Sequence, residues 1–252
     1  MLLAIDVGNT NTVLGLFAQQ ELQHSWRIKT DARQTADELE LIYRGLLRDT
    51  PDITGIALCS TVPAVLREMR TMMQRYYAHV PQVVVEPGVK TGVSVKTDNP
   101  KEVGTDRIMN SLAAFALYGG PSIVVDFGTS TNLDVISAKG EFLGGALAPG
   151  IEISIDALAA RAAQLRKVEL VAPRQVIGKN TVEALQSGAI YGFAGQVDGL
   201  VDRIIEELGQ DVTAVIATGG LASVVLPECE TITHHEPDLT LIGLRLMFER
   251  NQ

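Results

Sequence analysis

The sequence of 252 residues contains little cysteine, few aromatic residues and no excess of basic charge. Its two cysteines, Cys59 and Cys229, lie far apart and form no CxxC pair, so neither a disulfide framework nor a zinc site is predicted. We expect both to be plain buried thiols. Lysine and arginine total 21 against 30 acidic residues, and the net charge of -9 argues against a nucleic-acid partner, which clustered basic side chains would hold.

Long hydrophobic runs are missing as well. No apolar stretch reaches the about 18 residues that a membrane span needs. The N-terminal residues MLLAIDVG lack the basic start of a signal peptide, and an aspartate interrupts their apolar run. We therefore expect a cytoplasmic protein with no membrane partner. A nucleotide ligand stays open, because backbone N–H groups and a divalent cation can bind phosphates without basic side chains.

Strand-like and helix-like segments alternate along the chain, which predicts an α/β fold. Thr35 and Asp37 suit a helix start, and Pro63 suits the first turn of the next helix. Further helices are predicted over residues 151–163, 181–208 and 239–250.

The chain also repeats its own opening. A β-branched strand ends in Asp-x-Gly, continues into a Thr/Asn loop and a hairpin, and leads to a helix; this pattern begins at Asp6 and again at Asp126, near the middle of the chain. The repeat predicts two similar domains, residues 1–117 and 118–252, with a ligand cleft between them.

The first loop has the composition of a phosphate cradle. It offers glycine for close backbone approach, hydroxyl and amide donors, and a carboxylate at a strand end. A simple hairpin turn is the alternative. The loop and its flanks comprise Asp6, Val7, Gly8, Asn9, Thr10, Asn11, Thr12 and Val13.

A second copy of the loop, DFGTSTN from Asp126, favours the cradle, since two independent turns would have no reason to share these residues in matched strand contexts. Two such loops could clamp the β- and γ-phosphates of a nucleotide, as phosphoryl transfer requires. Gly219 and Gly220 end a later strand and could form a flat surface for adenine or ribose, with an ordinary strand-to-helix turn as the alternative.

The segments DVGNTNT, NPKEVGTDR, DFGTSTN, LGGALAPGIE and ATGGLA resemble, in order and spacing, the motif series of type III pantothenate kinases. The similarity runs from Asp6 to about Thr240. It implies two ribonuclease-H-like domains of the actin-like ATPase superfamily with a nucleotide cleft between them. It also implies ATP-dependent phosphorylation of the primary hydroxyl of pantothenate, the first step of coenzyme A biosynthesis, by a homodimer that uses magnesium and a monovalent cation, potassium or ammonium.

The resemblance assigns roles to individual residues. Asp106 becomes the base that accepts the hydroxyl proton. Asp6 lies near the magnesium of ATP, Asp126 binds potassium, and Thr129 contacts ATP. Thr181 reaches the pantothenate pocket at a dimer interface, although by position it also resembles a helix N-cap.

The remaining roles concern the acceptor segment. Gly104, Thr105 and Arg107 accompany Asp106 at the pantothenate site, where the Arg107 guanidinium suits a carboxylate; a helix cap with a surface ion pair is the alternative. Two residues depart from the family pattern: Thr97, which the resemblance puts in a wall of the pantothenate pocket, stands where tyrosine is common, and Thr105 stands where alanine or valine is common.

Two other functions stay open at this stage. One is a non-catalytic regulatory or accessory protein on the same scaffold, because a fold does not decide a function. The other is a phosphohydrolase of the superfamily, with water as the acceptor. The aspartates Asp6 and Asp106 together favour catalysis over binding alone, and Arg107 beside Asp106 favours an anionic organic acceptor over water.

Overall fold

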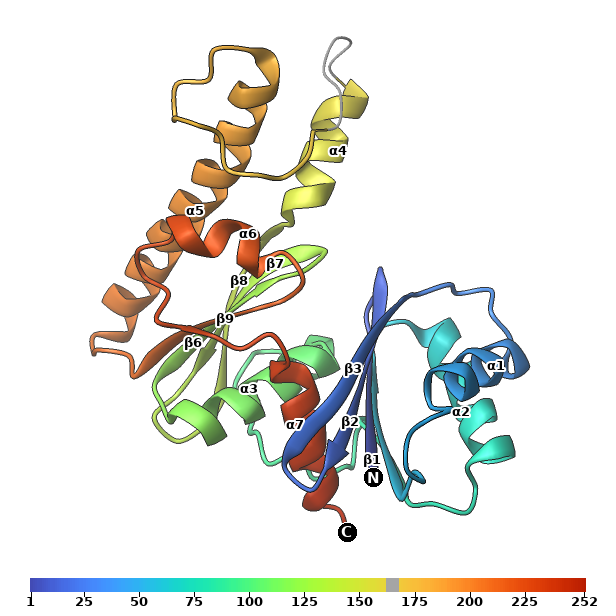
Figure 1. The fold of residues 1–252 in the computed structure, drawn as a ribbon. Coiled ribbons are helices and arrows are strands. Elements are labelled where there is room, and N and C mark those ends of the chain that lie inside the picture. Colours follow the sequence, from blue (N-terminus) through green and yellow to red (C-terminus); the bar gives the residue numbers. More distant parts are fainter. Residues whose placement is uncertain (162–167) are drawn as a thin grey trace. The chain divides into compact units, whose positions relative to one another are not determined.

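The structure is a computed structural model that describes residues 1–161 and 168–252. By packing, these residues form two compact units, each built around a five-stranded sheet with helices (Figure 1). The first unit comprises Met1–Val93, Asn99–Ala113 and Leu239–Gln252, and the second comprises Ser94–Asp98 and Ala114–Asp238. The predicted α/β fold is therefore confirmed.

The sheet of the first unit has the order β3-β2-β1-β4-β5. β1 is antiparallel to β2 and parallel to β4. The strands are β1 (Leu2–Val7), β2 (Asn11–Ala18), β3 (Glu21–Lys29), β4 (Gly55–Ser60) and β5 (Gln82–Val84). The helices that contribute to this unit are α1 (Ala36–Leu46), α2 (Pro63–Tyr76), the 3-10 turn η1 (Pro100–Glu102), α3 (Thr105–Tyr118) and α7 (Leu239–Glu249).

Side chains of β1 alternate between two cores, as the two-residue period of a strand requires. Leu3, Ile5 and Val7 pack with residues of α1 and α2 on one face. Ala4 packs on the other face with residues of β4, α3 and α7. Asp6 continues the second set, so its side chain lies on the face that α3 covers.

The sheet of the second unit has the order β10-β9-β6-β7-β8. Its central strand β6 is antiparallel to β7 and parallel to β9, which repeats the arrangement around β1. The strands are β6 (Ser122–Phe127), β7 (Ser130–Ile136), β8 (Phe142–Pro149), β9 (Ala214–Thr218) and β10 (His234–His235). The helices are α4 (Ile151–Arg161), α5 (Thr181–Leu208), α6 (Ala222–Val225) and the 3-10 turn η2 (Leu226–Glu228).

The predicted helix starts agree with the structure at two positions. Thr35 caps α1 in a capping box with Glu38, and Pro63 occupies the first turn of α2. The helix predicted over 151–163 is α4 up to Arg161, and its last two predicted residues lie outside the described ranges. Among the described residues, none of the helices combines the length and hydrophobicity that crossing a bilayer requires.

The C-terminal helix α7 packs with the first unit. Leu241, Leu244 and Met247 lie in one core with Ala4 of β1, so both ends of the chain build this unit. The limits 1–117 and 118–252 stay a prediction about domain boundaries.

Candidate active site in the two repeated loops

Asp6 lies at the carboxyl end of β1, beside Cys59 of β4. Parallel pairing places these two residues opposite each other. The Cys59 thiol donates a hydrogen bond to Asp6 Oδ1 at 3.2 Å. Cys59 is fully buried, as predicted, but it is not a plain core thiol, since it contacts a candidate functional carboxylate.

The first loop is a tight hairpin with exposed polar side chains. The Gly8 N–H donates to the Asn11 carbonyl at 3.0 Å, and a side chain at Gly8 would crowd that oxygen. Asn9, Thr10 and Asn11 are exposed to solvent.

The residues that flank the loop are held by the sheet. Val7 is buried and Val13 is half-buried. Thr12 is buried, and its hydroxyl shares a hydrogen bond of 2.9 Å with Thr30. These three side chains therefore support the loop more than they face solvent.

Asp106 lies in the first turn of α3. Its Oδ1 accepts a hydrogen bond of 2.9 Å from the Arg107 backbone N–H. The Thr105 hydroxyl donates to the Ser60 carbonyl at 3.3 Å, which ties the start of α3 to the end of β4. A side chain at Gly104 would collide with Asp106 Oδ1, so it would displace the Asp106 carboxylate.

The two carboxyls of the first unit interact. Burial, together with the charge of Asp106, raises the pKa of Asp6 to about 7, against a smaller lowering by the Cys59 hydrogen bond. Burial also raises the pKa of Asp106, while the N–H and charge of Arg107 lower it. In such a pair the repulsion raises the pKa of the carboxyl that ionises second, which here is Asp6. The structure thus brings Asp6, Cys59 and Asp106 into one electrostatic cluster.

The second loop and the glycine pair also come together, in the second unit. Gly219 has a left-handed backbone with φ of 91°, and a side chain there would meet Asp126 Oδ1 and the backbone of Phe127. Gly219 is half-buried and Gly220 is exposed. The close approach places the end of β9 directly against the predicted potassium-binding aspartate.

Thr129 connects the second loop to α4. Its side chain is exposed, and its carbonyl accepts a hydrogen bond of 3.1 Å from the Gly150 N–H just before α4. A side chain at Gly150 would collide with the carbonyls of Gly128 and Thr129, so the loop and the helix start fit closely.

Two predicted substrate residues lie elsewhere in the second unit. Thr97 is half-buried, and its hydroxyl has no hydrogen-bond partner within the described residues. Thr181 is exposed at the first residue of α5. The reading of Thr181 as a helix N-cap was wrong: Asn180 is the N-cap, and its side chain accepts from the Glu183 N–H at 3.0 Å. An amide side chain one residue earlier reaches the same donor.

The sequence reasoning missed Cys59 and Ser60 as parts of this cluster. Cys229 was also expected to be buried and is half-buried, with its thiol 3.6 Å from the Val225 carbonyl. A signal for Cys59 existed in the parallel pairing of the strands ending at Asp6 and Ser60, but its register is not readable from either strand alone.

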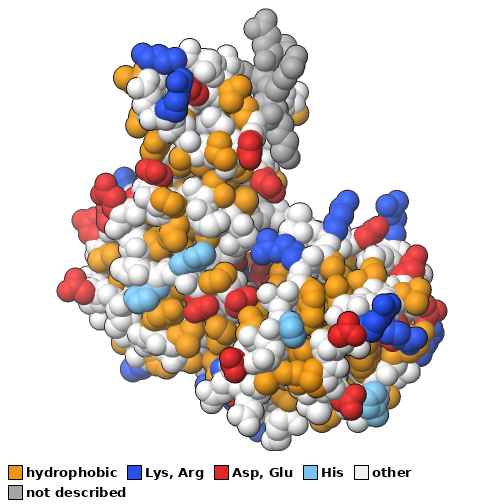
Figure 2. Space-filling view, in the orientation of Figure 1, with side chains coloured by type: hydrophobic (Ala, Val, Ile, Leu, Met, Phe, Trp, Pro, Cys, Tyr) orange, Lys and Arg blue, Asp and Glu red, His pale blue; other side chains and the backbone are white. Residues whose placement is uncertain are grey.

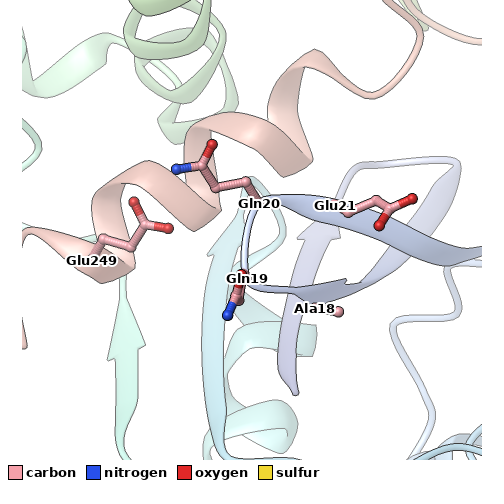
Figure 3. Close-up of a pocket in the computed structure, with 5 residues that line it drawn as sticks. All are labelled: Ala18, Gln19, Gln20, Glu21 and Glu249. Atoms are coloured by element: carbon pink, nitrogen blue, oxygen red, sulfur yellow. The ribbon is translucent and has the colours of Figure 1, made fainter.

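A pocket in the first unit lies away from these residues. It is lined by the turn between β2 and β3 and by the end of α7, with Ala18, Gln19, Gln20, Glu21 and Glu249 (Figure 3). None of the predicted functional residues lines it, and we assign it no role in the chemistry.

The described residues contain no group of three or more His, Cys, Asp or Glu side chains that could hold a metal ion by themselves. A cation at Asp6 or at Asp126 would therefore take further ligands from water or from substrate phosphates. A single carboxylate suits a hydrated magnesium ion that shares its ligands with substrate phosphates better than an all-protein cage would.

Sequence comparisons identify relatives over the whole chain. The family model for type III pantothenate kinase matches residues 2–203. The type III pantothenate kinase of Salinispora arenicola is 69% identical over 252 residues, and that of Frankia alni is 69% identical over 251 residues; the match covers 100% of both chains in each case.

Solved structures of similar shape support the fold. A conserved Campylobacter jejuni protein described as a candidate Baf family transcriptional activator has a TM-score of 0.62 at 18% identity, over 99% of this chain and 98% of that one. The ROK hexokinase of Thermus thermophilus has a TM-score of 0.57 at 14% identity, over 100% and 99%. At these identities the likeness shows the fold, which is that of the actin-like ATPases and ROK sugar kinases. On the sequence matches, the chain belongs to the type III pantothenate kinase family.

Proposed function

We propose that this protein transfers the γ-phosphoryl group of ATP to the primary hydroxyl of pantothenate, giving 4'-phosphopantothenate and ADP, the first step of coenzyme A biosynthesis. The observation that carries the proposal is the pairing of Asp6 and Asp106, two half-buried interacting carboxyls, in a member of this kinase family. The Asp6 carboxyl suits the nucleotide and its cation, and the Asp106 carboxyl suits the acceptor.

Asp106 is the proposed base. As the pantothenate oxygen forms its bond to the γ-phosphorus and the bond to the ADP oxygen breaks, the hydroxyl proton passes to the Asp106 carboxylate. Such a base contributes roughly a hundredfold to ten-thousandfold. Burial raises the pKa of Asp106, which makes its carboxylate a better proton acceptor than an exposed aspartate.

The repeated loops are the proposed phosphate-binding elements. The first, from Asp6 to Val13, offers the exposed side chains of Asn9, Thr10 and Asn11 as donors. In the second, the exposed Thr129 is the proposed contact to ATP, and the Gly219–Gly220 pair is the proposed surface for the adenosine.

Two cations complete the proposal. The Asp6 carboxylate would lie near magnesium, and the Asp126 carboxylate would hold a monovalent cation, potassium or ammonium. When bound, these cations would supply positive charge that offsets the phosphates, which suits a chain with a net charge of -9. A site with few protein carboxylates fits this role, because the substrate phosphates and water supply the other ligands.

The proposed pantothenate contacts are Gly104, Thr105, Arg107, Thr97 and Thr181. The planar guanidinium of Arg107 suits the pantothenate carboxylate. The Thr97 hydroxyl, which lacks a protein partner among the described residues, suits a polar atom of the substrate.

A homodimer is also proposed, because the family resemblance implies one. Apolar side chains are exposed on α4, on the segment before α5 and on the first turn of α5, and hydrophobic surface is visible on this part of the second unit (Figure 2). They are Ile153, Leu158, Val171, Val176, Ile177 and Val182. Thr181 lies beside Val182, which agrees with a substrate residue at such an interface.

A coupled ATP-consumption assay with and without pantothenate tests the function, in the presence of magnesium and potassium. We expect pantothenate-dependent turnover in the wild type and its loss by at least about a hundredfold in Asp106→Asn. ATP consumption that ignores pantothenate would identify a phosphohydrolase, and the absence of any turnover would favour the accessory-protein reading. Near-normal turnover of Asp106→Asn would exclude Asp106 as the base.

A further inference from the structure

The end of β4 contacts both halves of the proposed site in the first unit. Cys59, its penultimate residue, donates through the thiol to Asp6 Oδ1. Ser60, its last residue, accepts through the carbonyl from the Thr105 hydroxyl, next to Asp106. One dipeptide therefore connects the nucleotide aspartate and the segment that carries the base.

Asp6 needs such support because Asp106 repels it. A nearby like charge disfavours the ionised form of a carboxyl, and a hydrogen bond donated to the carboxylate favours it. Cys59 is fully buried, so water does not replace its thiol as the donor to Asp6 Oδ1.

Packing alone does not explain the identity of residue 59. Cys59 is fully buried between small and apolar side chains, including Ala4, Ala57 and Met109. A residue of similar size without a donor would fill the same volume, but it would leave Asp6 Oδ1 without this hydrogen bond.

We propose that Cys59 is a positioning residue, whose thiol orients the Asp6 carboxylate for the magnesium-bound nucleotide. The inference rests on the proposed function. It adds a residue that touches neither ATP nor pantothenate and acts through Asp6.

Calorimetric titration of ADP into three variants, each with magnesium and again with EDTA, tests the proposal without needing turnover. The variants are Cys59→Ala, Cys59→Ser and the control Cys229→Ser. We expect Cys59→Ala to weaken ADP binding about fivefold with magnesium and much less with EDTA. Cys59→Ser keeps a donor and should bind within about twofold of the wild type, as should Cys229→Ser.

A packing role predicts the opposite order, because a hydroxyl in an apolar core costs more than a methyl group. The proposal would be overturned if Cys59→Ala bound ADP with magnesium as tightly as the wild type does. It would also be overturned if Cys59→Ser bound ADP more weakly than Cys59→Ala. If Cys59→Ala does not fold by circular dichroism, Cys59→Val fills the volume without a donor and replaces it. Failure of the proposed function would show separately, as a wild type without pantothenate-dependent turnover.

Discussion

The absence of a side chain at Gly104 leaves room for the Asp106 carboxylate. A methyl group there would collide with Asp106 Oδ1, which the Arg107 N–H holds at 2.9 Å. We expect Gly104→Ala to lower turnover by about ten- to a hundredfold, because the base would move from its position. Steady-state kinetics and a melting curve measure this.

Gly45→Ala is the matched control for Gly104→Ala. Gly45 lies in α1 with open space where its Cβ would be, so alanine should leave turnover unchanged and stabilise the helix by about 0.5–1 kcal/mol. Equal turnover in both variants would show that the Gly104 contact does not matter for the chemistry.

Asp6 gives the protein a pH dependence of stability. Its pKa is about 7 in the folded protein against an ordinary 3.8, so between these pH values the folded state holds a proton that the unfolded chain has lost. Stability should therefore fall as pH rises through this range. We expect Asp6→Asn to remove this loss of stability. At pH 8 its free energy of unfolding should exceed that of the wild type by on the order of 1–3 kcal/mol.

Urea unfolding at pH 5 and pH 8 with EDTA measures the Asp6 effect. Asp49→Asn makes the same change of charge at an exposed aspartate and is the control. If the difference in unfolding free energy between Asp6→Asn and the wild type did not grow with pH, Asp6 would not be the source of the pH dependence.

At the scale of elements, the start of α5 separates a structural residue from a proposed substrate residue. Asn180 caps the helix, and Thr181 follows it with an exposed side chain. Asn180→Ala should cost about 1 kcal/mol of stability. Thr181→Ala should leave stability nearly unchanged and raise the KM for pantothenate. Thermal unfolding and initial rates distinguish them, and a reversed pattern would make Thr181 the structural residue.

The sequence predicted the elements well because their signals are local. β-branched runs, the repeated Asp-x-Gly loop and helical spacing all lie within short segments, and the structure has strands and helices at these places. The Cys59–Asp6 hydrogen bond was not predictable in the same way, since it depends on the register of two strands far apart in sequence. The cap of α5 was misplaced by one residue because Asn180 and Thr181 both suit the position.

At the scale of the whole molecule, α7 is the element whose partner the sequence did not indicate. Its apolar face predicts burial but does not say against which sheet. In the structure it crosses α3 closely, and a side chain at Gly243 would collide with the Met109 carbonyl.

Gly243→Val should therefore loosen the first unit more than the second. We expect hydrogen exchange to increase in β1, β2 and β4, while β6 and β9 keep their protection. Gly192→Ala in α5, where the added Cβ meets open space, is the control and should change neither unit. Equal loss of protection in both units would show that they unfold as one.

The contribution of α7 to the first unit has a consequence for how the protein is made. The second unit is nearly continuous in sequence and ends at Asp238, whereas the first unit needs the last residues to complete its core. During synthesis the ribosome delivers the N-terminal sheet first but its covering helix last. The half of the protein that is translated first should thus finish folding only after α7 has been made, and until then it exposes the sheet face that α7 covers.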